Sequence, residues 1–186
     1  YAPTLSEAEI KAGKEPPHEQ LSLIGEMREA MARREFLLYY QPKLALASGR
    51  IGGVEALIRW RHPQRGLVPP GSFIPFAEQT GFIRELTPWV LETAAAEVAR
   101  WNAQGIHLVP ALNLSAHDLL SPALLGHVRR VLDQHGLAPG ALCLEITESA
   151  LMEDPAQALA HLNQLAALGL KLAIDDYGVG QASLAY

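Results

Sequence analysis

Five oxygen-bearing side chains stand inside or directly after short apolar segments of the sequence. Glu55, Asn113 and Glu145 each interrupt an apolar run, and the adjacent Asp175 and Asp176 end another. A buried carboxylate without a counter-charge is costly, and a bound divalent cation is one such counter-charge. Hard cations prefer carboxylate and amide oxygens, so acids on corresponding strands indicate a shared cation. The alternatives left open are a solvated turn for the aspartate pair and a satisfied core amide for Asn113.

The two glutamates of the segment 144–149 have different expected environments. Residues alternate between the two faces of a strand, and Glu145 has apolar neighbours within its predicted strand. A position inside a barrel would explain this acid. Glu148 stands at the strand exit, where we expect an exposed side chain or one that braces a loop.

Positive charge gathers around Arg59, with Arg61 and Arg65 close by. Arg59 follows Glu55 by four residues, so both side chains point to the same face of a strand. Beside a carboxylate–metal cluster an arginine suits a phosphate, because its planar fork donates two hydrogen bonds. An ion pair with Glu55 is the alternative, and the local sequence leaves both open. We expect structural roles for His62, Trp89 and Trp101.

The overall composition narrows the function classes. The chain has 186 residues, 49% of them hydrophobic and 19% charged, as in ordinary globular domains. Its formal net charge of −5 argues against broad binding to DNA, RNA or anionic membranes, but not against a small phosphate-bearing ligand. The single Cys143 excludes an intramolecular disulfide and a Cys-rich zinc module, and we expect it to be a small buried hydrophobe.

Residues 1–18 lack periodicity and are rich in proline, which indicates a linker or the end of an upstream domain. The chain begins with Tyr1 and shows neither a secretory signal nor an apolar stretch of the roughly 18–20 residues that span a bilayer. We therefore expect a piece of a longer polypeptide. Its expected location is the cytoplasm, either within a cytoplasmic protein or as the cytoplasmic part of a larger membrane-bound protein.

Hydrophobic periodicity predicts an amphipathic helix that begins near Glu19. Three later helices are indicated by an N-cap residue, a proline at the first helical position and a glycine beyond the end. They are expected over residues 87–105, 121–136 and 154–169. Apolar or β-rich runs predict strands over residues 36–46, 51–60, 107–114, 141–147 and 170–174.

This order predicts an α/β fold in which a hairpin is followed by repeated strand–helix units and a parallel sheet. Polar residues cluster at the carboxyl ends of successive strands, and a barrel would gather those ends around one mouth. No glycine-rich phosphate-binding motif follows the first strand, which argues against common open-sheet nucleotide folds. We favour a partial (β/α)₈ barrel with about five of the eight strands that such a barrel needs.

A series of motifs then resembles one family, the EAL domains. The motifs occur in family order and spacing over roughly residues 21–186. They are Gln41-Pro42, Glu55-Ala56-Leu57-Ile58-Arg59-Trp60, Pro70-Gly71-Ser72-Phe73-Ile74-Pro75 with Glu78, Asn113-Leu114-Ser115, Glu145-Ile146-Thr147-Glu148 and Asp175-Asp176-Tyr177-Gly178.

The resemblance implies a TIM-like barrel whose first strand is antiparallel to the rest. It also implies hydrolysis of the bacterial second messenger cyclic di-GMP to its linear dinucleotide, pGpG, with two divalent cations, usually Mg²⁺ or Mn²⁺. Its implied metal ligands are Glu55, Asn113, Glu145, Asp175 and Asp176, of which Glu55, Asp175 and Asp176 count as catalytic. Its implied nucleotide contacts are Gln41, Leu57 and Arg59, and Glu148 would brace the loop after Asp176.

The sequence also departs from the family pattern. The segment 176–183 differs from the usual loop at four places, so loop-mediated dimerisation does not follow directly. The later strands of the family carry a catalytic Lys, a metal-linked Glu and a Gln that this chain does not supply. We thus expect residues 19–186 to form the N-terminal two-thirds of an EAL domain that is inactive alone. The parent protein is expected to be a phosphodiesterase, with a homodimer and an upstream diguanylate cyclase-like or sensor domain possible. A receptor that binds cyclic di-GMP without hydrolysis is the alternative.

Overall fold

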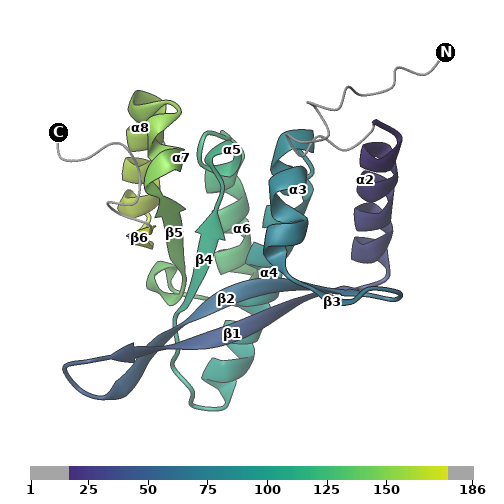
Figure 1. Ribbon diagram of the computed structural model, residues 1–186. Coiled ribbons are helices and arrows are strands. Elements are labelled where there is room, and N and C mark those ends of the chain that lie inside the picture. The colour runs from purple at the N-terminus through teal and green to yellow at the C-terminus, as the bar shows by residue number, and fades with distance from the viewer. Residues whose placement is uncertain (1–16, 176–186) are drawn as a thin grey trace.

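The computed structural model describes residues 17–175, which form a helix, then a hairpin, and then alternating helices and strands (Figure 1). The helices are α2 (Pro17–Ala32), α3 (Ile74–Thr80), α4 (Ile83–Ala103), α5 (Ala116–Leu119), α6 (Leu124–His135), α7 (Glu148–Met152) and α8 (Pro155–Ala167), with 3₁₀ turns η1 (Pro70–Ser72) and η2 (Pro139–Ala141). The strands are β1 (Phe36–Ala45), β2 (Arg50–His62), β3 (Gly66–Val68), β4 (Pro110–Leu114), β5 (Cys143–Thr147) and β6 (Lys171–Asp175).

All six strands form one sheet in the order β1-β2-β4-β5-β6, and β3 pairs with β2. The strand β1 runs antiparallel to β2, whereas β2, β4, β5 and β6 run parallel to one another. Within residues 17–175 the sheet is open between β1 and β6. No helix of this described part combines the length and apolar character needed to cross a membrane.

One face of the sheet is apolar and packs against helices. Ala56, Leu112, Leu144 and Leu172 are in register across β2, β4, β5 and β6. The first three are buried in a cluster with residues of α4, α6 and α8, and Leu172 packs against it. Because side chains alternate along each strand, the residues between these leucines point to the opposite face. The packing of one face therefore fixes which residues the other face presents.

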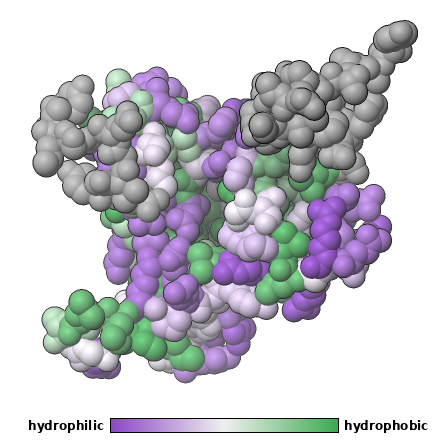
Figure 2. All heavy atoms as spheres, viewed as in Figure 1, coloured by the Kyte–Doolittle hydropathy of each residue, from purple (hydrophilic) through white to green (hydrophobic). Residues whose placement is uncertain are grey.

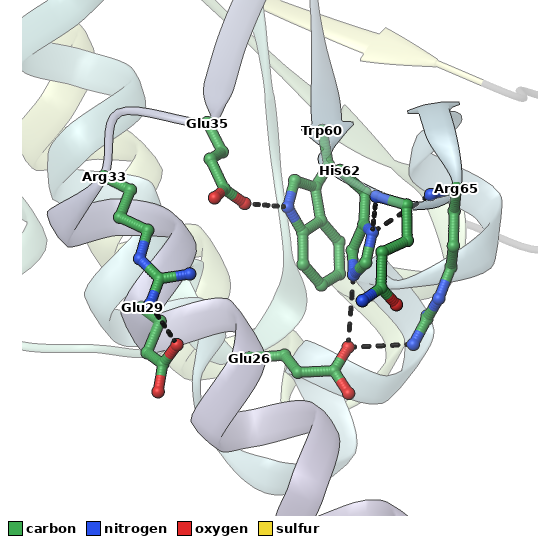
Figure 3. Close-up of polar contacts among 8 residues, drawn as sticks. Glu26, Glu29, Arg33, Glu35, Trp60, His62 and Arg65 are labelled. Atoms are coloured by element: carbon green, nitrogen blue, oxygen red, sulfur yellow. Dashed lines mark hydrogen bonds and ion pairs between the residues drawn. The ribbon is translucent and has the colours of Figure 1, made fainter.

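A second apolar cluster supports the far end of the hairpin. Trp60 and Phe36 pack with Phe73 and with residues of α2, α3 and α4. Polar contacts surround this cluster (Figure 3): the indole Nε1 of Trp60 donates to Glu35 at 3.1 Å. His62 is buried, and its Nδ1 accepts hydrogen bonds from two backbone amides of the following turn. The expected structural role of His62 is thus confirmed.

The predicted α/β architecture, the parallel strands and the antiparallel first strand are all confirmed. Three glycines stand just beyond helices, as predicted: Gly105, Gly136 and Gly169. Their positive φ angles of 75°, 62° and 87° are the left-handed conformation in which glycine commonly ends a helix. Asp154 caps α8 as predicted by accepting from the Gln157 amide at 3.1 Å. The expected linker 1–18 lies outside the described residues, apart from its last two positions, where α2 begins.

Two predicted helix starts are wrong. The helix expected from Thr87 begins at Ile83 and carries Pro88 in its interior. Thr87 does not cap it, because its hydroxyl instead donates to Asp118 at 2.7 Å. The helix expected from Ser121 begins at Leu124. The short elements β3, α3, α5 and α7 were not predicted. The three helices each have fewer than two full turns, and β3 has three residues, so none of them is long enough to show a hydrophobic period.

The hairpin tip and the edge of β6 leave large apolar side chains exposed. Leu44, Leu46 and Ile51 form an exposed hydrophobic patch at the end of β1 and β2, visible in green in Figure 2. Ile174 is exposed on β6, which pairs on one side only within residues 17–175. Open strand edges and apolar patches of this kind favour association.

We predict that the 186-residue chain, expressed by itself, self-associates at micromolar concentration. Light scattering after size-exclusion chromatography measures this directly. The variant Leu46→Ser with Ile51→Ser should lower the associated fraction, whereas Leu159→Ser, an exposed leucine on α8, should not. A monodisperse monomer of the unchanged chain would contradict the prediction.

Candidate active site

The predicted site residues of four strands lie on the face of the sheet opposite the helix-packed leucines. Gln41 of β1 pairs with Glu55 of β2, and Asn113 of β4 pairs with Glu145 of β5. Residues in register across a sheet share a face. These four side chains therefore line one face of the sheet, as the barrel interpretation predicted.

Glu55 and Asn113 are in direct contact. The side-chain amide of Asn113 donates a hydrogen bond to Glu55 Oε1 at 3.0 Å across the β2–β4 pairing. The bond orients the carboxylate and leaves the amide oxygen of Asn113 free of any donor among the described residues. Two oxygen donors from neighbouring strands thus stand side by side, which argues against the core-amide alternative for Asn113, an exposed residue.

Glu145 is buried and forms an ion pair with Lys43 of β1. The ammonium of Lys43 contacts Oε1, while Oε2 of the same carboxylate is buried without a hydrogen-bond partner. The pKa of Lys43 lies above its ordinary value. Partial burial lowers this pKa, but the hydrogen bond and charge of Glu145 and the charge of Glu55 together raise it by more. The ammonium therefore stays charged at neutral pH.

The aspartate pair is described only in part. Asp175 is exposed at the last position of β6, in register with Thr147 of β5, and Asp176 lies outside the described residues. Within residues 17–175, no three His, Cys, Asp or Glu side chains stand close enough together to hold a metal ion. The structure thus shows Glu55 and Asn113 in contact. It does not describe all five predicted metal ligands, because Asp176 lies outside the described residues.

The donors that are described fit a hard divalent cation. They are carboxylate and amide oxygens, which Mg²⁺ and Mn²⁺ prefer over nitrogen or sulfur. The buried Glu145 Oε2 without a partner is an acceptor that a cation could satisfy. Cys143, two residues before Glu145, does not add a thiolate, because burial raises the pKa of its thiol. Cys143 is only partly buried, rather than fully buried as expected.

Arg59 does not pair with Glu55 within the described residues. Its Nη1 donates to the backbone carbonyl of Ile58 at 2.8 Å, and its guanidinium carbon lies 5.8 Å from the centre of the Tyr39 ring. The ion-pair alternative is therefore wrong for this structure. A guanidinium held by a ring and one carbonyl keeps further N–H donors for an anion.

A cavity of about 520 Å³ opens beside the middle of β2 and the carboxyl ends of β4 and β5. It is lined mostly by apolar side chains, including Leu57, together with Asn113, Glu78 and Asp118. Figure 2 shows a recess with hydrophobic residues at its base between α3 and α5. Cavities of this size hold small-molecule ligands in many proteins. Leu57 and Asn113 thus connect the cavity to the predicted ligand set.

Asp118 is a buried carboxylate of this cavity that the sequence analysis missed. Its Oδ2 accepts hydrogen bonds from the hydroxyls of Ser115 at 2.6 Å and Thr87 at 2.7 Å. Burial raises the pKa of Asp118 above its ordinary value, although these hydrogen bonds and His117 lower it in part. The spacing Ser115-x-x-Asp118 at the start of α5 was a helix-capping signal that could have located it.

Glu78 of α3 is a second carboxyl in the cavity wall. Burial raises its pKa, and the charges of Asp118 and Glu153 add to this effect, whereas His117 opposes it. Two acids with raised pKa values in one mostly apolar cavity are a common feature of functional sites. Glu78 belongs to one of the motifs noted in the sequence, but no role was assigned to it.

The comparisons with known proteins agree with this geometry. The EAL domain family model matches residues 24–186. The chain belongs to the EAL domain family.

Individual relatives are similar over most of this EAL chain. It is 45% identical over 170 residues to "Bifunctional diguanylate cyclase/cyclic di-GMP phosphodiesterase MucR" and 43% identical over 169 residues to "Cyclic di-GMP phosphodiesterase NbdA", both of Pseudomonas aeruginosa. Each match covers 90% of this chain but only 25% and 22% of the relatives. The chain therefore spans about a quarter of the length of these relatives.

Solved structures match the EAL fold as well. "PaMucR Phosphodiesterase, c-di-GMP complex" aligns with a TM-score of 0.83 at 43% identity, over 87% of this chain and 66% of that one. The cAMP- and cyclic-di-GMP-bound form of the EAL enzyme Bd1971 aligns with a TM-score of 0.83 at 27% identity, over 95% and 49%. The TIM-like fold of the EAL domain is thus shown, with the barrel open in the described part.

Of the two alternatives for Glu148 in this EAL site, exposure is wrong, and loop bracing stays a prediction. Glu148 was expected at the strand exit as an exposed acid or a loop brace. It is instead buried as the first residue of α7, directly after Thr147, whose side chain caps the helix by accepting from the Ala150 amide at 3.3 Å. An acid in the first turn suits the positive end of a helix. Its predicted contact with the loop after Asp176 lies outside the described residues.

We predict that the titration of Asp118 makes the free energy of unfolding fall as pH rises above 3.8, the ordinary pKa of an aspartate. The folded protein holds this proton more tightly than the unfolded chain, so the free energy of unfolding falls until pH passes the raised folded pKa, and then levels off. Replacement Asp118→Asn removes this dependence. The melting-temperature difference, variant minus unchanged protein, should therefore grow between about pH 3.5 and pH 7.

Asp133→Asn on α6 is the control for this measurement, because Asp133 is exposed. Its melting temperature should follow that of the unchanged protein at every pH. A constant difference for Asp118→Asn across the range would contradict the proposed titration.

Proposed function

We propose that the protein hydrolyses cyclic di-GMP to the linear dinucleotide pGpG with two divalent cations, Mg²⁺ or Mn²⁺. The carrying observation is the set of oxygen donors that successive strands present on one face: Glu55 beside Asn113, then Glu145 with a buried oxygen that lacks a partner. Relatives named as cyclic di-GMP phosphodiesterases support the substrate and the reaction.

Each site residue has a proposed part in this reaction. Glu55, Asn113, Glu145, Asp175 and Asp176 would hold the cations. Bound there, the cations would activate a water molecule and stabilise the charge that develops on the phosphate. The strand residues fix the distances between these donors, because the apolar face of the sheet is locked by the leucines packed behind it.

Three further residues would position the nucleotide. Arg59 would donate to the phosphate with the N–H groups that Ile58 does not use, and Gln41 and Leu57 would contact the nucleotide. Gln41 lies directly beside Glu55 on the neighbouring strand, and Leu57 forms part of the cavity wall. The mostly apolar cavity excludes water from one side of the bound ligand, which strengthens polar interactions there.

The remaining expectations on assembly are also proposals. The name of MucR joins a diguanylate cyclase with a phosphodiesterase, which supports an upstream cyclase-like domain in the protein that contains this chain. We further propose a cytoplasmic site of action and a homodimer of the complete domain. We also propose that the 186-residue chain by itself has little activity, because the resemblance to EAL domains implies further site residues on later strands.

We predict that Glu55→Gln lowers cyclic di-GMP turnover at least about a hundredfold, because a lost metal ligand removes several kcal/mol of transition-state stabilisation. Product formation by the whole natural polypeptide is measured by chromatography with Mg²⁺, with Mn²⁺ and with a chelator. Glu29→Gln, an exposed residue of α2, is the control and should keep full turnover.

The same assay separates hydrolysis from binding alone. Tight binding of cyclic di-GMP with no pGpG in the presence of either cation would favour the receptor alternative. Turnover that persists in excess chelator would contradict the two-metal proposal.

We predict that Arg59→Lys raises the Michaelis constant by about tenfold to a hundredfold, because hydrogen bonds to charged groups contribute about 1.5–3 kcal/mol and a lysine lacks the planar fork. Arg61→Lys, an exposed position two residues along β2, is the matched control. Unchanged kinetics for Arg59→Lys would limit Arg59 to its contacts with Tyr39 and Ile58.

A further inference from the structure

Lys43 and Glu145 meet although their strands are not neighbours. The sheet places β2 and β4 between β1 and β5. Strands lie about 4.8 Å apart, so a flat sheet would separate β1 from β5 by roughly 14 Å. The two side chains nevertheless form an ion pair. The pair therefore spans the concave side of a curved sheet, which is the side that presents the predicted metal ligands.

Small residues leave room for this contact. Gly53 is the β2 partner of Lys43, and Ala111 is the β4 partner of Glu55. A Cβ atom at Gly53 would approach the carbonyl oxygen of Val109 to 3.0 Å, so the backbone packing itself disfavours a larger residue there. The space over β2 and β4 is thus kept open along the line between Lys43 and Glu145.

The two partners differ in their freedom to move. The Glu145 side chain is 11% exposed and rises from the middle of β5, whereas the Lys43 side chain is 42% exposed and has four rotatable carbons. A rotamer change therefore brings the ammonium of Lys43 into water more readily than the carboxylate of Glu145. Glu55 also lies close enough to act on the charge of Lys43.

We propose that Lys43 is the counter-ion of the metal-free site: its ammonium neutralises Glu145 until a divalent cation takes its place. This inference rests on the proposed metal site. The ammonium and the cation compete for the same carboxylate, and Lys43 turns toward solvent when the cation binds. Lys43 therefore stabilises the metal-free protein and weakens the apparent affinity for metal.

The test compares Lys43→Met with the unchanged whole natural polypeptide. Methionine keeps the length of the side chain and removes its charge. Lys171→Met is the matched control, because Lys171 begins β6 opposite Cys143, is exposed, and its side chain makes no hydrogen bond or ion pair among the described residues. Mn²⁺ affinity is measured from the electron paramagnetic resonance of free Mn²⁺, and melting temperatures are measured in chelator and in saturating Mn²⁺.

Lys43→Met should bind Mn²⁺ at least about tenfold more tightly than the unchanged protein, because the cation no longer has to displace an ammonium from the Glu145 carboxylate. It should also melt at a lower temperature in chelator and gain more from Mn²⁺. Lys171→Met should match the unchanged protein in both measurements.

Three outcomes would overturn the inference. Equal or weaker Mn²⁺ binding by Lys43→Met overturns the counter-ion role alone, and so does an equal effect of Lys171→Met, which would reflect net charge. Absence of Mn²⁺ binding by all three proteins overturns the two-metal proposal together with this inference. Neither Mn²⁺ affinity nor melting temperature depends on turnover, so a protein that binds Mn²⁺ but does not hydrolyse cyclic di-GMP would not produce any of these outcomes.

Discussion

A parallel sheet that buries one face against helices must present every second residue on the other face, and the site depends on this constraint. The leucines at positions 112 and 144 fix β4 and β5 against α4, α6 and α8. Asn113 and Glu145, their immediate neighbours, are thereby directed to the concave side at a set register. A slip of one residue would exchange the leucines for the polar groups. The apolar core thus determines the geometry of the polar site as well as the stability of the domain.

The two apolar clusters support different parts of this arrangement. The larger one lies behind the parallel strands and carries Asn113 and Glu145. The smaller one holds the far end of the hairpin through Trp60 and Phe36, with α2 and α3 around it. Arg59 precedes Trp60 on β2, so its position depends on the smaller cluster. The proposed phosphate contact and the proposed metal ligands are therefore held by separate packing units that meet along β2.

The sequence was sufficient for most of the fold because its signals were local. Prolines, capping residues and glycines located the helices, and continuous apolar runs located β4, β5 and β6. Thr87 misled this reasoning, because its hydroxyl bonds to Asp118, which is 31 positions away in the sequence, and no local pattern reveals such a pair. Arg59 was ambiguous for the same reason: its partner, the Tyr39 ring, lies on another strand. Asp118 and Lys43 gained their importance only from tertiary packing.

Lys43 also bears on how a cluster of acids can be compatible with folding before any metal is present. A buried carboxylate without a partner is strongly destabilising, and many metal sites are therefore ordered only when metal binds. Among the described candidate metal ligands, the most buried acid, Glu145, has an ammonium beside it, whereas Glu55 is bonded to an amide and remains nearer to solvent. Charge compensation is thus placed where desolvation is greatest. The strand framework can form first and accept a cation afterwards, because the cation exchanges with a side chain that has a solvent-exposed alternative.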